Sequence, residues 1–542
     1  MSAKHASKPH PNLHRLHRKA YGSFHQGDLD RAERFCSEIL NYRPDDFDAL
    51  HLLGLLSLQR QRLPEALYFL SAAIQSDPSS VDALSNLGLA FHASGRYEDA
   101  ISCYRNGLGL VPAHQDSLYN LGNAFLEMGR LAEALSAYNE VLARKSDHVG
   151  ALVNRGNTLL RLNQPLQALA SYDAALAAMP GHPQILTNRG HALRRLDRLA
   201  EALADLKRAV AAAPELPEAH FEKALAHLTL GEFEEGFEAY EWRWKTGAFA
   251  RYRRPFRSGP WLGEQPLSGK TILLHAEQGF GDTIQFIRYA PLLVRQGARV
   301  ICEVQAELQP LLSQFEGVEV IASGQPVPSF DLHCPLLSLP LAFRTGFETI
   351  PAAVPYLAAS PARKQIWRDR LPQGRMRVGL VWSGSPSHKN DANRSISLAR
   401  LKPLLGNSST HFVSLQRELR GGDAEIIQGL PNLFHLGDKL ADFADTAAVV
   451  SLLDVVISVD TAVAHLSGAL GKPVLILLPH AADFRWMKGR DDSPWYPNAK
   501  LLRQPTFGDW ESVIGRLSDE LSGVAGRAGP DGSVRFSLTT SI

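Results

Sequence analysis

The sequence predicts an α-helical repeat array followed by an α/β region of two halves with a cleft between them. A 34-residue period runs from His14 to Arg251, and from Gly269 onward short apolar runs alternate with helical segments. The length of 542 residues also exceeds what one hydrophobic core usually serves, since domains typically span roughly 50–250 residues. We therefore expect two or three domains.

The expected domain boundaries follow these changes of pattern. Residues 522–542 are rich in Gly and small residues with little periodicity, which is typical of a disordered tail. The full set is a disordered leader at 1–13, seven repeats at 14–251, a linker or docking segment at 252–268, a first α/β half at 269–365, a second α/β half at 366–521, and the tail.

Composition favours a soluble cytoplasmic protein. The net charge of +1 gives no overall attraction to nucleic acid or to an anionic membrane. The basic N-terminus lacks the apolar core of a signal peptide, and no stretch approaches the ~20 apolar residues of a membrane span. The four cysteines form no CxxC pair, so we expect no disulfide or zinc site. His5, His10, His14 and His17 would bind a metal only on a scaffold that holds them, and a polar leader is the simpler interpretation.

The repeats come into register when the chain is cut every 34 residues from His14. The seventh position of a unit holds a small residue, where two helices must approach closely. The fourteenth position, at the expected inter-helix turn, is Gly in four units and Gln61, Asn163 or Asp197 in the other three. The seventh-position residues are Gly54, Gly88, Gly122, Gly156, Gly190 and Ala224, and the fourteenth-position glycines are Gly27, Gly95, Gly129 and Gly231.

This pattern resembles the tetratricopeptide repeat. The resemblance implies helix pairs stacked into a superhelix whose concave face commonly holds a peptide or protein. The alternative is a spacer or oligomerisation device without a ligand, and the sequence names no partner.

An aromatic segment follows the last repeat. Trp242, Trp244, Phe256 and Trp261 are more aromatic side chains than a free linker carries, so we expect them to cap the last repeat and dock it on the next domain. Four arginines lie in the same region and form either a solvated face or a surface for an anionic ligand. They are Arg251, Arg253, Arg254 and Arg257.

The α/β region is predicted from its strands. Strand, helix and strand in succession imply parallel sheets with right-handed crossovers. A helix is expected from about Asp282 to Gln296. The expected strands are 271–275, 299–304, 318–322 and 330–333 in the first half, and a strand opening at Arg377, 411–416, 455–459 and 474–478 in the second half.

Two turns that follow strands are candidate ligand sites, because ligands bind at the carboxyl ends of the strands in open α/β sheets. Gly279 and Gly281 begin a dinucleotide fingerprint, but its third glycine is absent. Asp282 is then either a helix cap or a carboxylate that faces the cleft. The second turn carries Asp460 and Thr461, with His465 one helical turn later.

These two segments, Q-G-F-G-D-T and S-V-D-T-A-V-A-H-L-S-G-A-L-G-K-P-V, resemble glycosyltransferase family 9, the ADP-heptose heptosyltransferases. The combination of E-W-R-W and D-S-P-W-Y-P with the repeats is similar to bacterial proteins in which such repeats are fused to this domain. The resemblance implies a GT-B fold of two Rossmann-like halves, with the acceptor mainly on the first half and a nucleotide-sugar donor mainly on the second. It also implies inversion without a metal.

The resemblance implies a role for each matched residue. Asp282 matches the general base that takes the acceptor proton. Asp460, Thr461 and His465 match the donor motif, whose backbone N–H groups would face the diphosphate. His465 is equally compatible with a structural hydrogen-bonding group.

The other donor-binding candidates are less directly matched. Gly279 and Gly281 let a ligand approach the backbone. Ser383 opens a loop that ends at Ser395, in which Arg394 is the candidate phosphate ligand and Lys389 competes with it. A later segment supplies aromatic side chains and paired charges that suit a sugar or a domain seam equally well; it offers Arg485, Trp486, Trp495 and Tyr496.

The sequence therefore predicts an inverting, metal-independent glycosyltransferase. The nucleotide-diphosphate sugar is a co-substrate, no cofactor is expected, and the repeats select a protein, glycan or lipid-linked acceptor. The alternative is a non-catalytic repeat scaffold whose GT-B domain only binds nucleotide or docks a partner. The residues do not distinguish an ADP sugar from a UDP or GDP sugar, and an Asp282→Asn variant is expected to lose transfer but keep nucleotide binding.

Overall fold

The computed structural model describes residues 12–406 and 410–525. Most of the expected leader and tail, residues 1–11 and 526–542, lies outside the described residues, together with His5 and His10. The last helix, α25 (Trp510–Ala525), extends a few residues past the expected start of the tail. The chain divides into two compact units, Met1–Arg189 and Gly190–Ile542.

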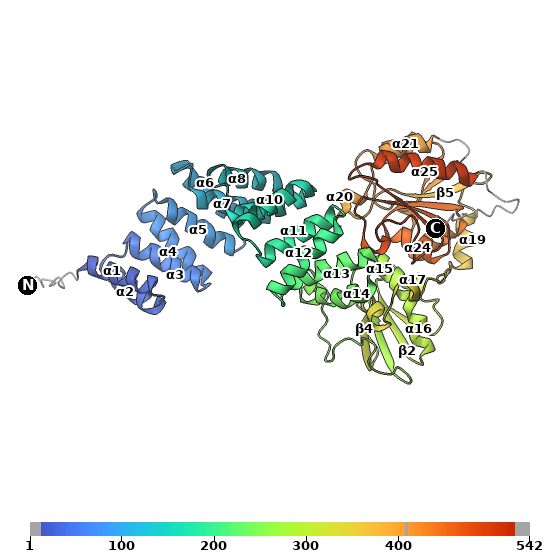
Figure 1. Cartoon of the computed structure of the whole chain (residues 1–542), viewed down its shortest axis with the longest axis horizontal. Coiled ribbons are helices and arrows are strands. Elements are labelled where there is room, and N and C mark those ends of the chain that lie inside the picture. The colour runs from blue at the N-terminus through green and yellow to red at the C-terminus, as the bar shows by residue number, and fades with distance from the viewer. Residues whose placement is uncertain (1–11, 407–409, 526–542) are drawn as a thin grey trace, which may run out of the picture. The chain divides into compact units, whose positions relative to one another are not determined.

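The N-terminal part is all-helical and consists of helix pairs (Figure 1). Polar side chains begin several of the helices. Asn12, Asp28, Asp46 and Ser80 each accept a hydrogen bond from the backbone N–H of the third residue that follows, which satisfies one of the free donors of a helix start. The helices are α1 (Leu13–His25), α2 (Leu29–Tyr42), α3 (Phe47–Gln59), α4 (Leu63–Ser76), α5 (Val81–Ala93), α6 (Tyr97–Leu110), α7 (Gln115–Glu127), α8 (Leu131–Arg144), α9 (Val149–Arg161), α10 (Pro165–Ala178), α11 (Pro183–Arg195), α12 (Leu199–Ala212), α13 (Pro217–Leu230) and α14 (Phe233–Tyr240).

The two periodic positions of the repeat have the expected roles. A Cβ added at Gly88 would lie 2.4 Å from Cε1 of Tyr104, so the two helices of that pair approach as closely as a glycine permits. Every fourteenth position has a positive φ, including the non-glycine residues Gln61, Asn163 and Asp197. These left-handed residues end the first helix of each pair and turn the chain into the second.

The C-terminal part is α/β and contains two parallel sheets (Figure 1). The four-stranded sheet has the order β3-β2-β1-β4, and the six-stranded sheet has the order β10-β9-β8-β5-β6-β7. The strands are β1 (Thr271–His275), β2 (Arg299–Val304), β3 (Val318–Ala322), β4 (Leu332–Pro335), β5 (Met376–Val381), β6 (Thr410–Ser414), β7 (Leu433–His435), β8 (Val455–Val459), β9 (Val474–Leu478) and β10 (Ala499–Arg503).

Several elements differ from the sequence-based expectation. The fourth strand begins two residues later than expected. The helix expected from Asp282 is interrupted: α15 (Phe280–Phe286) is followed by a 3-10 turn at Ile287–Tyr289 and by α16 (Ala290–Arg295). Pro291 lies at the start of α16, where its missing N–H prevents one continuous α-helix. The strands β7 and β10 were not predicted, because β7 has only three residues and the apolar run of β10 is interrupted by Lys500 and ends at Arg503.

Helices cover both faces of the six-stranded sheet. One face packs against α21 (Leu398–Leu405), α25 and the partly buried apolar residues of α22 (Asp423–Gln428) (Figure 1). The other face packs against α23 (Phe443–Leu452) and α24 (Ala462–Ala469). The remaining helices are α17 (Gln309–Leu312), α18 (Leu339–Ala342), α19 (Pro361–Arg368) and α20 (Asp391–Arg394).

One hydrophobic core joins the last repeat to the α/β region. It contains Phe233, Phe237 and Tyr240 of α14 together with residues of both sheets, such as Leu274 and Ile476. The last repeat is therefore packed as part of the α/β unit, across the boundary expected at residue 251.

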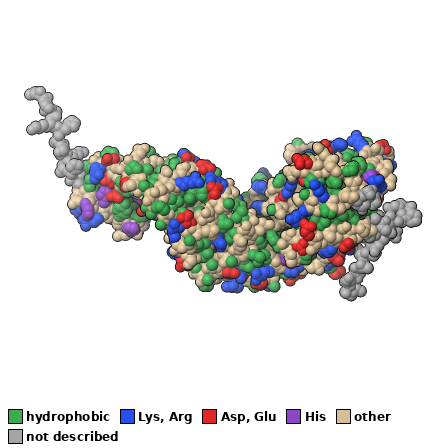
Figure 2. Space-filling view, turned by 90° about the horizontal axis from the view of Figure 1, so that it is seen from above, with side chains coloured by type: hydrophobic (Ala, Val, Ile, Leu, Met, Phe, Trp, Pro, Cys, Tyr) green, Lys and Arg blue, Asp and Glu red, His purple; other side chains and the backbone are tan. Residues whose placement is uncertain are grey.

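The surface carries charges of both signs. Lys and Arg side chains are interspersed with Asp and Glu side chains on the face shown in Figure 2, in keeping with the net charge of +1. Among the described residues, no helix is both long and apolar enough to cross a membrane.

Candidate functional site

The candidate residues follow strands at the switch points of the two sheets. Numbered within its own half, the second sheet has the order 6-5-4-1-2-3, which is the doubly wound Rossmann order read from the other edge. Its order reverses between β5 and β8, and these strands lead into the Ser383 loop and the Asp460 turn. The first sheet reverses between β1 and β4, and β1 leads into the Gly279–Asp282 turn.

The Asp282 carboxylate makes two contacts. Gly279 is the N-cap residue of α15, and its backbone N–H donates to Oδ2 of Asp282 at 2.7 Å. Asp282 thus caps the helix from its third position rather than from the N-cap position. Its Oδ1 accepts a hydrogen bond from the Arg485 guanidinium of the second half. The carboxylate is therefore both a local cap and a bridge between the two halves.

The Asp460 turn presents the start of α24. Thr461 is the N-cap residue, but its hydroxyl lies 3.0 Å from Ser458 Oγ and makes no cap hydrogen bond, so the side chain of the N-cap residue leaves the first N–H groups of this helix free. The backbone carbonyl of Asp460 accepts a hydrogen bond from Arg394 Nη1 at 2.9 Å. Burial and the nearby Asp483 raise the pKa of Asp460 to about 6.

His465 lies where the two motifs meet. Its Nδ1 is 3.0 Å from the Tyr496 hydroxyl, and its ring stacks on Trp486 at a centroid distance of 5.0 Å. A Cβ added at Gly281 would lie 2.8 Å from His465 Cδ2, so helices α15 and α24 touch at this point. Burial, aided by the Arg485 charge, lowers the pKa of His465 to about 3, which keeps the imidazole neutral.

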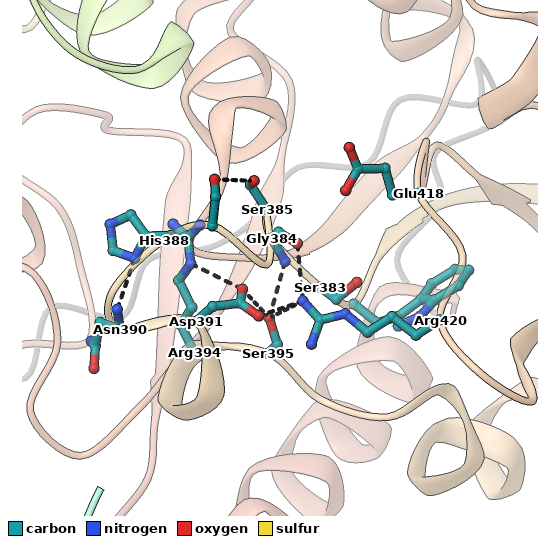
Figure 3. A network of polar contacts seen from close by, with 12 residues as sticks. Ser383, Gly384, Ser385, His388, Asn390, Asp391, Arg394, Ser395, Glu418 and Arg420 are labelled. Carbon is teal, nitrogen blue, oxygen red and sulfur yellow. Dashed lines mark hydrogen bonds and ion pairs between the residues drawn. The ribbon is translucent and has the colours of Figure 1, made fainter. Parts of the chain in front are cut away.

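The loop from Ser383 to Ser395 is held by its own polar network (Figure 3). The Gly384 N–H donates to Ser395 Oγ at 3.0 Å, and the Arg420 guanidinium donates to the Gly384 carbonyl and to Asp391. The Ser383 hydroxyl is buried and has no hydrogen-bond partner among the described residues. The hydrogen bonds thus fix the loop, and the Ser383 hydroxyl remains available to a ligand.

Arg394 and Lys389 lie in different environments within this loop. The Arg394 guanidinium lies against Gly384 and contacts the Asp460 carbonyl, with 13% of its side chain exposed. Lys389 is exposed. Of the two phosphate-ligand candidates, Arg394 is the one that contacts the Asp460 turn.

Arg485 is a site residue whose role the sequence left open. Its Nη1 lies 2.7 Å from Asp483 Oδ1, and its Nη2 pairs with Asp282. Burial disfavours its charge, but Asp483 and Asp282 outweigh this effect and raise the pKa of Arg485. The mixture of Asp, Arg and aromatic residues at 483–486 was the only sequence signal, and it did not show that Asp282 is the partner.

The repeat array carries a second set of polar residues that sequence reasoning missed. Asn154 donates to Asn123 Oδ1 at 2.9 Å and to the Tyr119 hydroxyl at 3.2 Å, and Asn188 donates to Asn157 Oδ1 at 3.2 Å. Residues 120, 154 and 188 are all Asn and recur at the 34-residue period, so this column was visible in the sequence. The amides link the first helices of successive repeats.

One group of potential metal ligands lies in the first repeat. Among the described residues, His17, Asp46 and Asp48 offer ligand atoms within 4.8 Å of one another. Asp46 already accepts the Ala49 N–H at 3.1 Å and lies 3.6 Å from Arg43, so a cation would compete with both contacts. We assign no metal to this group.

The four cysteines are buried and free.

The comparison with family models concerns the repeats. The tetratricopeptide repeat model matches six overlapping segments from residue 20 to residue 242. Residues 20–242 are tetratricopeptide repeats. The match agrees with the 34-residue period, the left-handed turn residues and the close helix contact at Gly88.

A curated relative matches more than the repeats. The chain is 27% identical to Protein FlbA of Caulobacter vibrioides (strain ATCC 19089 / CIP 103742 / CB 15) over 335 residues, which is 56% of this chain and 54% of that protein. The chain therefore spans about half the length of this relative. Because the matched share exceeds the length of the repeats, part of the match lies in the α/β region.

Three solved structures each match less than half of this chain. The crystal structure of MamA protein is 22% identical, with a TM-score of 0.29, and the match covers 31% of this chain and 91% of that chain. A tetratricopeptide repeat protein from Parabacteroides merdae ATCC 43184 is 19% identical, with a TM-score of 0.37 and coverages of 43% and 93%. YrrB, described as a TPR protein with an unusual peptide-binding site, is 20% identical, with a TM-score of 0.31 and coverages of 35% and 98%.

Proposed function

We propose that this chain is an inverting, metal-independent glycosyltransferase. It transfers a sugar from a nucleoside diphosphate donor to an acceptor selected by the repeats, and its α/β region is a GT-B domain. The observation that carries the proposal is the contact between the two motif segments. Gly281 lies against His465, and Asp282 reaches the second half through Arg485. One polar turn from each sheet's switch point thus contributes to one cluster of side chains.

In this proposal the donor diphosphate lies at the start of α24. Backbone N–H groups and the positive end of the helix dipole attract phosphate oxygens, and Arg394 and Ser383 supply further donors. Two observations support a diphosphate here. The N-cap side chain of α24 makes no cap hydrogen bond, and the Ser383 hydroxyl has no hydrogen-bond partner among the described residues.

Asp282 acts as the general base. It takes the proton of the acceptor hydroxyl while the hydroxyl oxygen attacks the anomeric carbon from the face opposite the diphosphate. The bond from the anomeric carbon to the phosphate oxygen breaks, its electron pair leaves with the nucleoside diphosphate, and the configuration inverts. The acceptor is a protein, a glycan or a lipid-linked molecule that the repeats select, and their concave face is the surface that would hold a peptide or protein.

One observation favours the alternative of a non-catalytic scaffold whose α/β region only binds nucleotide or docks a partner. The Asp282 carboxylate is paired with Arg485, so its Oδ1 is already occupied by the guanidinium and does not face an acceptor hydroxyl unless the pair separates. An activity measurement separates the two functions.

The test is a thermal-shift screen of ADP, UDP and GDP sugars, followed by measurement of nucleoside diphosphate release. We expect at least one donor to raise the Tm of the wild type, and Asp282→Asn to lose about 100-fold or more of turnover while keeping the shift. Asp331→Asn is the matched control, because Asp331 accepts the Thr271 N–H at the opposite end of β1. Full turnover by Asp282→Asn would exclude the base assignment. If no nucleotide stabilises the wild type, the donor site itself is wrong.

A further inference from the structure

Arg485 is a buried cation held between two carboxylates from different parts of the α/β region. Only 8% of its side chain is exposed, and its guanidinium contacts Asp483 and Asp282. The guanidinium also lies 4.3 Å from the ring centroid of Phe484. A cation in such a site is strongly positioned, because moving it would leave its own charge buried and would leave Asp282, with 18% of its side chain exposed, without a cation.

The contacts of Arg485 leave one donor unused. Its Nε is buried and has no hydrogen-bond acceptor among the described residues. The Ser383 hydroxyl also has no hydrogen-bond partner there. Arg394 Nε makes no hydrogen bond either, although it lies 3.7 Å from Asp391 Oδ1. Buried polar groups are almost always hydrogen-bonded, so three unused groups in one neighbourhood indicate a missing acceptor.

The three groups belong to one neighbourhood. Arg394 contacts the Asp460 carbonyl and lies against Gly384, the residue after Ser383. Arg485 pairs with Asp282, and Gly281 beside it lies against His465 of α24, the helix that the Asp460 turn begins. The His465 ring also stacks on Trp486, the residue after Arg485. Because the unused groups include two guanidinium N–H donors, the missing acceptor is an anion with several oxygens, which a diphosphate provides.

We propose that Arg485 binds the donor diphosphate and that donor binding draws it away from Asp282. This inference rests on the proposed function. The two negative charges of a diphosphate compete with the single charge of Asp282 for the same guanidinium. The carboxylate becomes an unpaired base only when the donor is present, so the donor binds before the acceptor reacts.

The segment that carries Arg485 is anchored on the last repeats. Lys488 donates its backbone N–H to the Thr229 carbonyl at 2.9 Å, and its ammonium lies 2.9 Å from Asp197 Oδ2. Between these contacts and Arg485, Met487 has a φ of 50°, a region that favours glycine. Such a residue persists only where its surroundings hold it, and strained residues of this kind cluster at ligand clamps and switches.

The test is calorimetric titration of the full-length protein with ADP, UDP and GDP. We expect Arg485→Gln to weaken binding of the preferred nucleotide by about 10- to 100-fold, as expected for the loss of hydrogen bonds to a charged group. Asp282→Asn should tighten binding about three- to tenfold, because the competing carboxylate charge is removed. Arg490→Gln is the matched control; Arg490 pairs with Asp492 in the same segment and should leave the affinity unchanged.

The outcomes separate this inference from the proposed function. Unchanged affinity in a folded Arg485→Gln protein would overturn the inference and leave the donor site standing. If Arg485→Gln does not fold, Asp282→Asn decides, and an affinity equal to or weaker than that of the wild type would overturn the inference. A wild type that binds none of the three nucleotides would overturn both.

Discussion

At the scale of single residues, the two motif carboxylates are placed in different environments. Asp282 accepts a backbone N–H and pairs with Arg485. Asp460 is partly buried, and desolvation together with the charge of Asp483 raises its pKa to about 6. A carboxylate with a raised pKa is neutral at low pH and gains its charge as the pH rises through that value. The charge of the proposed donor site therefore depends on pH in the neutral range.

Donor affinity should rise as the pH falls from 7.5 to 5.5. Asp460 then becomes protonated and stops repelling the diphosphate, while Arg394 and Arg485 stay charged and His465, with a pKa of about 3, stays neutral. We expect a three- to tenfold change, roughly the effect of one nearby charge at high effective dielectric constant. The measurement is calorimetric titration with a nucleotide sugar, whose phosphates do not titrate in this window. Asp460→Asn should abolish the pH dependence, and a flat profile in the wild type would contradict it.

At the scale of elements, a single turn residue shapes each repeat. The fourteenth position has a positive φ in every repeat, whether the residue is Gly95 or Gln61. L-residues with a side chain pay roughly 1–2 kcal/mol for this conformation, and glycine does not. The sequence pattern located this turn because the requirement is local: it concerns the backbone of one residue and not a distant partner.

Exchanging the residues of two turns tests this account. Gly95→Gln should lower the free energy of unfolding of the array by about 1 kcal/mol, and Gln61→Gly should leave it unchanged or raise it slightly. A Cβ at Gly95 would meet no atom within 4 Å, so any loss reports backbone strain and not a clash. Urea unfolding followed by circular dichroism measures both. Equal effects of the two substitutions would show that the turn conformation does not matter.

At the scale of the whole molecule, the last repeat is built into the α/β unit by a buried ionic contact. Arg243 follows α14 and is fully buried, and its guanidinium donates to both carboxylate oxygens of Glu277 at 3.0 Å and to Ser338 at 2.8 Å. Glu277 lies two residues before Gly279. The last repeat therefore holds the strand end from which the candidate base extends.

Removing one partner of this contact should destabilise the protein strongly. Arg243→Met should cost about 3–5 kcal/mol of unfolding free energy, because Glu277 would remain buried without its cation. The double variant Arg243→Met, Glu277→Leu should recover much of that loss. Arg299→Met is the control, since its pair with Glu319 is exposed and worth about 1 kcal/mol or less. Equal stability of Arg243→Met and wild type would exclude a structural role for the contact.

The sequence by itself determined the repeats, most strands and the two polar turns, since each depends on neighbours along the chain. Periods of 34 residues, left-handed turn positions and apolar runs such as Val455–Val459 are local patterns with local causes. Only the tertiary structure decided that Asp282 pairs with Arg485, 203 residues away, and that Arg243 anchors Glu277. Such pairs depend on which strand ends the topology brings together. A charged residue looks the same in the sequence whether it faces solvent, a ligand or a buried partner.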